Sequence, residues 1–348
     1  MNTKVFNNDE LFEAVNDLTE TYNVYAPASD GDYYNFKPLD KRKKNNFNFQ
    51  NTRMSAKSAL YPQSEGMFEC SNDSEQENAG VLRDVEKEYG PLAVVGIRPC
   101  DAHAFKIVKR NFDNPDYRDP WWNRRYESSL LVGLGCNDPC ATCFCDSTGG
   151  GPFDEKMLDV MIYDLGDKYL AKGITEKGDE FLKNTTTGNP AAEDIIKQAD
   201  ELAESVTKKM DSQVKTDKLG EKVINDIFDA PFWEEVAFAC INCGTCTYLC
   251  PTCWCFDIQD ETYGKEVLRM RNWDTCMSPL FTLEGSGHNP RTEKMQRVRQ
   301  RFMHKLKYYV DKYENGIQCS GCGRCVRYCP VNIDIRQVAG LMNNYSKQ

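Results

Sequence analysis

The spacing of apolar residues predicts a helix close to the start of the chain. Residues 8–20 begin with acidic side chains and place apolar residues at helical intervals, at Leu11, Phe12, Val15 and Leu18. Residues 22–50 are polar, basic and rich in asparagine, with no sustained period. We therefore expect a helix followed by a long surface loop.

Two short continuous apolar runs, residues 91–100 and 128–136, predict buried strands. The segment between them, residues 101–112, has the composition of a helix. Each run ends at a cysteine, Cys100 in the first and Cys136 in the second. Open α/β sheets place their sites at the carboxyl ends of strands, so both cysteines are candidates for a shared site.

The middle of the chain predicts a β-hairpin and then helices. Two β-rich runs are joined at Gly166 and Asp167, which favours an antiparallel hairpin. Residues 175–184 and 190–212 are polar and helical in composition. Two amphipathic helices, broken near Pro231, are expected over residues 218–240.

Composition directs attention to sulfur. The chain has 348 residues, 17 cysteines, 3 histidines and a formal charge of −10. This charge argues against nucleic acid or an anionic membrane as partner. No apolar stretch approaches the roughly 20 residues of a membrane span, and the N-terminus lacks a signal-peptide core. We therefore expect a cytoplasmic protein, in which a disulfide framework is disfavoured and metal binding is favoured.

The cysteines divide the chain unevenly, with two in the first 135 residues, four over residues 136–145 and eleven over residues 240–329. Such a shift in composition is typical of domain boundaries. We expect an α+β protein. Its parts are a mixed α/β domain over residues 1–152, a hairpin and helical connection over 153–230, and a helical, cysteine-rich domain over 231–348.

A duplicated cysteine motif is the strongest chemical signal. Residues 240–251 and 319–330 both read C-x-x-C-x-x-C-x-x-x-C-P. This is the ligand run of two-cluster ferredoxins, in which the fourth cysteine of each run binds the other run's cluster. The motif assigns one [4Fe-4S] cluster to Cys240, Cys243, Cys246 and Cys329, and a second to Cys319, Cys322, Cys325 and Cys250.

A pair of zinc sites is the structural alternative. Zinc sites usually combine paired C-x-x-C hooks or include histidine, whereas both runs here have four cysteines and a closing proline. The pattern therefore favours iron–sulfur clusters over zinc.

Sixty-eight residues separate Cys250 from Cys319, and their composition is helical, especially over 293–314. The domain resembles the α-helical ferredoxins of succinate dehydrogenase iron–sulfur subunits and of the heterodisulfide reductase C-subunit. The basic side chains of residues 293–314 favour a solvated face. A docking face for an acidic partner is the alternative.

Nine cysteines lie outside the twin runs. Six motifs that include most of them together resemble one family: GIRPCDAHAF, CFCDSTGGGP, CINCGTCTYLCPTCWCFDI, WDTCMSPLF, GHNPRTEKMQRVRQRFMHK and CSGCGRCVRYCPVNID. The family comprises the iron–sulfur electron-transfer subunit of anaerobic sulfite reductase and the beta subunit of cytosolic sulfhydrogenases. The resemblance covers most of residues 50–340.

This resemblance implies a third iron–sulfur cluster held by Cys100, Cys136, Cys143 and Cys145, with Cys140 as an extra residue. A purely structural role for these four is the alternative. Cys253, Cys255 and Cys276 either bind a further centre or serve as packing or redox thiols, and Cys70 is expected to be inert. The three histidines, His103, His288 and His304, are expected to be polar packing residues.

Several clusters in one chain indicate electron transfer. The chain lacks a G-x-G-x-x-G turn and a Walker loop, so flavin and nicotinamide are expected on a partner protein. The resemblance implies an iron–sulfur subunit of an anaerobic complex. It would lie between a flavin/NAD-binding partner and a terminal subunit such as a hydrogenase, a sulfite or sulfur reductase, or a heterodisulfide-reductase-like enzyme. The alternative is a sulfur or disulfide reductase that reacts at its own cysteine-rich centre.

Overall fold

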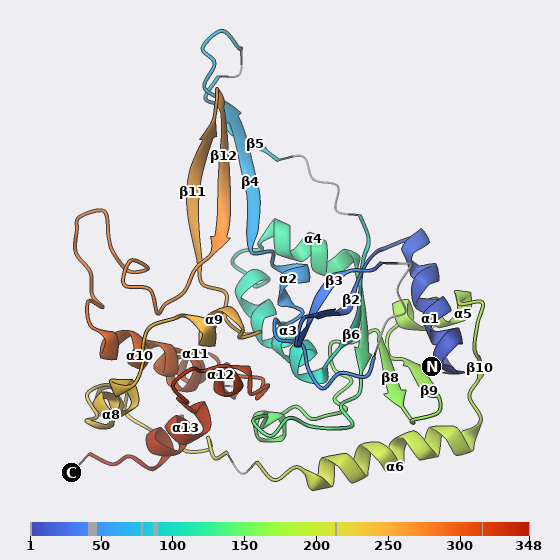
Figure 1. Ribbon diagram of the computed structural model, residues 1–348. Coiled ribbons are helices and arrows are strands. Elements are labelled where there is room, and N and C mark those ends of the chain that lie inside the picture. Colours follow the sequence, from blue (N-terminus) through green and yellow to red (C-terminus); the bar gives the residue numbers. More distant parts are fainter. Residues whose placement is uncertain are drawn as a thin grey trace.

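The computed structural model describes residues 2–40, 47–77, 79–85, 90–212, 214–314 and 316–347. Figure 1 shows three regions: a sheet with helices packed on it, a narrow arm of strands that extends away from the body, and a group of helices close to the C-terminus. None of the helices in these ranges combines the length and the apolar character needed to cross a membrane.

The main sheet has eight strands in the order β10-β1-β9-β8-β7-β6-β2-β3. Neighbours in the block β2, β6, β7 and β8 are parallel, and the other pairs are antiparallel. The strands are β1 (Thr3–Phe6), β2 (Asn23–Asp30), β3 (Tyr33–Pro38), β6 (Leu92–Ile97), β7 (Ser129–Leu134), β8 (Val160–Asp164), β9 (Tyr169–Gly173) and β10 (Asn189–Pro190). The predicted hairpin at Gly166 is therefore present as β8 and β9, and it belongs to this sheet.

Helices cover both faces of this sheet. They are α1 (Asn8–Asp17), α2 (Lys57–Leu60), α3 (Pro99–Phe112), α4 (Pro120–Ser128), α5 (Glu176–Asn184) and α6 (Glu193–Lys209), with short 3-10 turns η1 (Leu18–Glu20) and η2 (Cys145–Thr148). Successive residues of β6 face opposite sides, so that Val95 packs with α1 and α5 while Val94 packs with α3 and α4. Both faces are buried, which explains why β6 and β7 are continuous apolar runs.

The predicted surface loop over residues 22–50 is wrong for its first half, where β2 and β3 form a hairpin at the edge of the sheet. Only Val24, Ala26 and Pro27 of β2 are buried, so the apolar alternation is too short to recognise in a polar sequence. The pairing of β2 with β6, which is distant in the chain, supplies the missing stabilisation. Residues 41–46 of the predicted loop lie outside the described residues.

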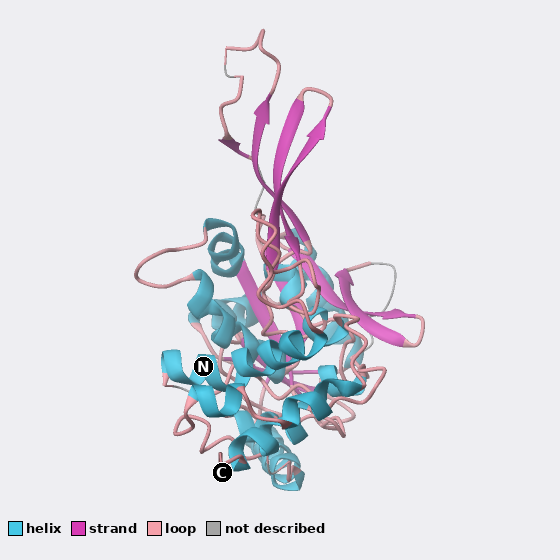
Figure 2. Ribbon diagram, turned by 90° about the vertical axis from the view of Figure 1, so that its left-hand side faces the viewer, coloured by secondary structure: helices cyan, strands magenta, loops and turns pink. Residues whose placement is uncertain are grey.

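The arm is an antiparallel sheet in the order β11-β12-β4-β5, and Figure 2 shows it extending from the body. Its strands are β4 (Ser64–Ser71), β5 (Arg83–Asp84), β11 (Phe256–Tyr263) and β12 (Glu266–Trp273). The predicted helical character of residues 251–318 is therefore wrong for β11 and β12. Gly264, with a φ of 64°, allows the tight turn between them, and β12 pairs with β4 from the N-terminal half.

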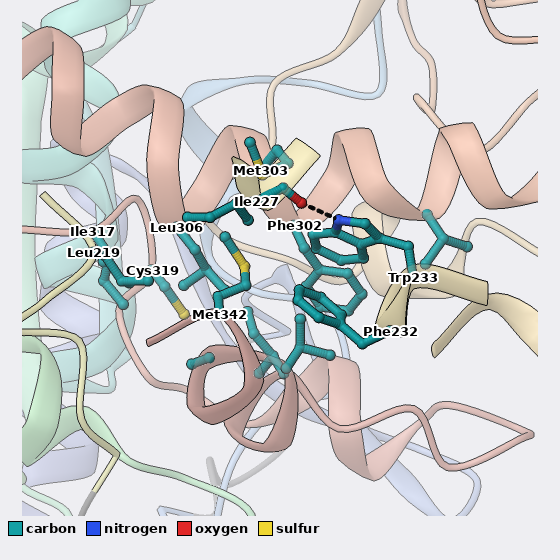
Figure 3. Packing of buried hydrophobic residues seen from close by; sticks show 14 of the residues in the cluster. Leu219, Ile227, Phe232, Trp233, Phe302, Met303, Leu306, Ile317, Cys319 and Met342 are labelled. Atoms are coloured by element: carbon teal, nitrogen blue, oxygen red, sulfur yellow. Dashed lines mark hydrogen bonds between the residues drawn. The ribbon is translucent and has the colours of Figure 1, made fainter. Parts of the chain in front are cut away.

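The C-terminal region is helical, as predicted. It contains α7 (Ile224–Phe228), α8 (Phe232–Phe238), α9 (Thr245–Tyr248), α10 (Lys294–Met303), a π-helical turn η3 (His304–Tyr308), α11 (Tyr309–Tyr313), α12 (Arg324–Arg327) and α13 (Ile335–Asn344). Its core packs Trp233 against Phe302, and the Trp233 indole donates a 2.7 Å hydrogen bond to the carbonyl oxygen of Ile227 (Figure 3).

The basic residues of α10 and η3 correct one prediction. A solvated face was expected, but Arg297, Arg301, Lys305 and Lys307 are all buried. Two of these charged groups find partners inside the protein: Arg297 donates to the carbonyl oxygen of Arg291 at 2.9 Å, and Lys307 donates to that of Leu219 at 3.0 Å. Long cationic side chains can bury their stems in this way when the head group is satisfied.

Candidate metal centre

The two cysteine runs adopt the same local backbone. In the first, Asn242 and Gly244 have φ values of 57° and 74° ahead of the short helix α9. In the second, Gly321 and Gly323 have φ values of 67° and 72° ahead of α12. Left-handed residues between the cysteines turn the loop tightly, which lets closely spaced thiols face a common centre. The duplication seen in the sequence is therefore also a structural duplication.

The structure brings the first predicted ligand set to one cavity, which is lined by Cys240, Cys243, Cys246 and Cys329. Cys325 and Cys329 of the second run also line this cavity, so cysteines of both runs meet there. Burial raises the pKa of the Cys246 thiol to about 11, whereas Cys243 is exposed to solvent. This set therefore lies at the protein surface.

The second predicted set lies deeper. Cys319, Cys322, Cys325 and Cys250 are all buried. Burial, together with the charges of Cys250 and Cys325, raises the pKa of the Cys319 thiol to about 12. These thiols are therefore neighbours, and Cys250 reaches the second run from the first.

Buried cations surround both sets. Arg301 is 5 % exposed and Lys305 is 3 % exposed. Burial alone would lower the pKa of Lys305, but the thiols of Cys250 and Cys253 raise it above its ordinary value. The Nε and Nη2 atoms of Arg301 have no hydrogen-bond partner in the described part of the chain. Buried cationic nitrogens without a partner are costly, so this arrangement fits an anionic group at the cysteines.

An iron–sulfur cluster ligated by thiolates is such an anionic group, and an all-cysteine donor set suits it. Across the described ranges, no three or more His, Cys, Asp or Glu side chains are placed to hold a single metal ion. Ligands of a cubane bind different irons and lie farther apart than the ligands of one ion. The residues therefore fit the clusters that the motif predicts.

The third predicted set gathers where β6 and β7 end. Cys100 lies in the first turn of α3 and Cys136 follows β7, and these two strands are parallel neighbours. Cys143 and Cys145 lie in the following loop, and the Cys145 thiol interacts with Cys143, Cys100 and Cys136. A hydrogen bond between Cys143 and Cys145 raises the pKa of Cys145 and lowers that of Cys143. The expected convergence of the two strand ends is therefore present.

Cys140 lies close to the third set as well. It is buried, and its backbone carbonyl accepts a 2.9 Å hydrogen bond from the amide of Cys143. Burial raises the pKa of its thiol, and Arg327 counteracts this rise. The structure thus places Cys140 beside the predicted ligands Cys136 and Cys143.

The third set is packed directly against the second. The amide of Phe144 donates a 2.7 Å hydrogen bond to the carbonyl oxygen of Gly321. A Cβ atom on Gly321 would lie 2.5 Å from the Phe144 backbone, and one on Gly323 would lie 2.5 Å from the Thr142 backbone. Glycine is therefore required in the second run for this close approach as well as for its backbone conformation.

A buried ion pair holds the same contact together. Arg324, in the second run, donates a 2.9 Å hydrogen bond to the Asp101 carboxylate and another of 2.9 Å to the carbonyl oxygen of Thr52. Asp101 follows Cys100 in α3. The charges of Cys100 and Cys322 also interact, which shows that the two sets adjoin.

These buried cations were not predicted from the sequence. Arg297, Arg301 and Lys305 recur at intervals of four residues beside the apolar positions Val298 and Phe302. This spacing placed them next to the buried stripe of the helix and could have identified them. Lys57, which donates a 3.1 Å hydrogen bond to the carbonyl oxygen of Cys253, carries no such signal in the sequence.

Of the remaining cysteines and histidines, four lie around one cavity and the other three lie elsewhere. Cys253, Cys255 and Cys276 line one cavity, together with His304. Cys70 is buried in β4, opposite Val267. His103 lies 3.7 Å from the Asp154 carboxylate, and His288 is exposed.

Comparisons with known proteins agree with this geometry. A family profile described as a 4Fe-4S dicluster domain matches residues 239–333. Sulfhydrogenase 2 subunit beta of Pyrococcus furiosus is 30 % identical over 325 residues, which cover 92 % of this chain and 92 % of that protein. No solved structure matched the chain. The chain therefore belongs to the sulfhydrogenase beta-subunit family and contains a 4Fe-4S dicluster domain.

Proposed function

We propose that this protein is the iron–sulfur electron-transfer subunit of an anaerobic oxidoreductase complex. The continuity of the three cysteine sets carries the proposal. The third set adjoins the second through the contact of Phe144 with Gly321. The second adjoins the first because Cys325 and Cys329 line the cavity of the first run, and the first set reaches the surface at Cys243.

Bound clusters would each accept and release single electrons at potentials set by hydrogen bonds, charge and solvent exposure. The chain's own residues support this role. Arg301 and Lys305 offset the negative charge of the first two sets inside the protein. Burial of Cys319, Cys322 and Cys325 excludes water from the second set.

The cluster assignment is part of the proposal. We assign Cys240, Cys243, Cys246 and Cys329 to one [4Fe-4S] cluster, and Cys319, Cys322, Cys325 and Cys250 to the second. Cys100, Cys136, Cys143 and Cys145 are assigned to a third. Changing Cys143 to serine is then expected to lower the iron content by about four irons per chain. An unchanged iron content in C143S would contradict the assignment of the third cluster.

A partner surface is expected beside the first set. Phe238 is 84 % exposed and Ile241 is 62 % exposed, and they flank Cys240 in the chain. Exposed apolar residues of this size beside a site often mark a contact with another protein. We assign this surface to a redox partner, either the flavin/NAD-binding subunit or the terminal catalytic subunit that the family relationship suggests.

Purification of the complex from native anaerobic cells tests the proposal. The chain is expected to co-purify with a flavoprotein, and the isolated holoprotein is expected to show no sulfur or disulfide reductase activity with an artificial electron donor. Turnover by the isolated chain would contradict the proposal and favour an enzyme that acts at its own centre.

A substitution at the proposed partner surface gives a second test. F238E is expected to weaken co-purification and electron exchange with the partner while the iron content stays that of the wild type. Tyr117, an exposed aromatic residue in the α/β region, provides the matched control Y117E. Equal behaviour of F238E and Y117E would place the partner elsewhere.

A further inference from the structure

A separate cavity in the C-terminal half is lined by cysteines that lie outside the twin runs. Its volume is about 280 Å³, and three thiols face it, those of Cys253, Cys255 and Cys276. The β11–β12 hairpin explains why these residues meet. Cys255 precedes β11 and Cys276 follows β12, and the amide of Asp274 donates a 2.9 Å hydrogen bond to the carbonyl oxygen of Cys255. Closing the hairpin therefore brings its two ends, with their thiols, to one place.

The wall of this cavity is cationic. Arg291, Arg301 and Lys305 line it, and no carboxylate is among the described residues that do so. Arg301 is more than nine-tenths buried, yet its Nε and Nη2 atoms find no hydrogen-bond partner in the described ranges. Buried polar atoms are normally satisfied, so these atoms indicate a bound group.

The cavity lies beside both sets of the dicluster domain. Arg301 also lines the cavity of Cys240, Cys243, Cys246 and Cys329. On the other side, the thiols of Cys250 and Cys253 are hydrogen-bonded to each other, and Lys305 interacts with both. A redox group in this position would exchange electrons with either cluster of the domain.

We propose that Cys253, Cys255 and Cys276 bind an additional [4Fe-4S] cluster, with one iron that has no cysteine ligand. Thiolates are the donors that iron–sulfur clusters prefer, and three of them face a cavity larger than a single ion needs. A [4Fe-4S]²⁺ core with three thiolates has a net charge of −1, which Arg301 and Lys305 would offset. The iron without cysteine would be open to a small anion from the cationic cavity.

Iron analysis of the anaerobically purified holoprotein tests this assignment. The wild type is expected to contain about sixteen irons per chain, and C276S about twelve. Cys70 is also buried and lies away from this cavity in β4, so C70S is the matched control and is expected to keep about sixteen. Equal iron in C276S and the wild type would overturn the assignment. Loss of zinc instead of iron would also overturn it.

A second measurement does not depend on a variant that folds. A cubane with only three cysteine ligands loses its fourth iron on mild oxidation, so ferricyanide is expected to produce the EPR signal of a three-iron cluster in the wild type and in C70S. Absence of that signal in the wild type would overturn the assignment. Peptide mapping that finds a Cys255–Cys276 disulfide in the purified holoprotein would also overturn it, because the two thiols would then form a dithiol/disulfide pair.

The outcome is separable from that of the proposed function. C143S tests the third set and C276S tests this cavity, and the two sets share no residue. If both assignments hold, the double variant loses about eight irons. If only the cavity assignment fails, C143S still loses about four while C276S loses none.

Discussion

The Asp101–Arg324 ion pair provides a quantitative test of how the α/β region is joined to the dicluster domain. Asp101 is 1 % exposed and Arg324 is 2 % exposed. The Nη2 atom of Arg324 lies 2.9 Å from the Oδ2 atom of Asp101. At that separation and an effective dielectric constant of about 20, Coulomb's law gives an attraction of about 6 kcal/mol. Desolvation of the two charges opposes this attraction, so the net contribution of the pair is smaller.

The substitution D101N removes one charge and keeps the shape of the side chain. Breaking a buried pair from one side costs about 3–5 kcal/mol, because the remaining charge stays buried without its partner. Arg324 keeps its hydrogen bonds to Thr52, and in the holoprotein the thiolates of the proposed ligands Cys322 and Cys100 supply some negative charge. We therefore expect the lower end of this range, about 3 kcal/mol in the free energy of unfolding.

The assay is urea unfolding of the holoprotein in anaerobic buffer, followed by tryptophan fluorescence and by the absorbance of the clusters, with the refolding branch recorded. The matched control is E127Q, which removes the Glu127 partner of the exposed Arg118 and is expected to cost less than about 1 kcal/mol. The double variant D101L/R324M is expected to recover much of the loss, since it removes both buried charges. If D101N costs no more than E127Q, the pair does not hold the two regions together and the reasoning is refuted.

Three further predictions concern the cysteine runs and their surroundings. C240S and C329S are each expected to lower the iron content by about four irons per chain. The double variant is expected to lose no more iron than either single variant, because both residues are assigned to one cluster. A loss of about eight irons in the double variant would contradict the exchange of ligands. G323A is expected to destabilise the protein more than G264A in urea unfolding. Both glycines have a left-handed φ, but only at Gly323 would the new Cβ lie close to backbone atoms, at 2.5 Å. Equal losses of stability in the two variants would refute the close packing. R301M is expected to lower the reduction potential of the first cluster in an EPR-monitored redox titration, because the substitution removes a buried cation. R299M, on the same helix, serves as the control. An unchanged or higher potential in R301M would contradict the role of Arg301.

Local features of the fold were predictable where a few neighbouring residues determine them. The apolar runs that became β6 and β7, the hairpin at Gly166 and the helices around Pro231 are all present. The hairpin of β2 and the edge strand β3 was missed because its sequence is largely polar and because the pairing that stabilises β2 is with the distant strand β6. The arm was missed for the same reason, since β12 pairs with β4.

The candidate site shows the same division. The spacing of the cysteines predicted the iron–sulfur character of the twin runs, because three thiols must lie close in the chain to reach one cubane. The two apolar runs predicted that Cys100 and Cys136 follow the carboxyl ends of buried strands, and the structure makes these strands parallel neighbours. The cationic surroundings could not be predicted, because the burial of Arg301 and Lys305 depends on what packs against their helix.

The sequence by itself determined that this protein carries a 4Fe-4S dicluster domain, and it predicted which cysteines bind iron and in what grouping. Only the tertiary structure decided how the groups are arranged. It placed Cys145 beside the second run, joined Asp101 to Arg324, and brought Cys255 and Cys276 together at the base of a hairpin. The physical reason is range. Ligand spacing and turn conformation depend on adjacent residues, whereas contacts between residues more than 200 positions apart, such as Asp101 and Arg324, depend on the packing of the whole chain.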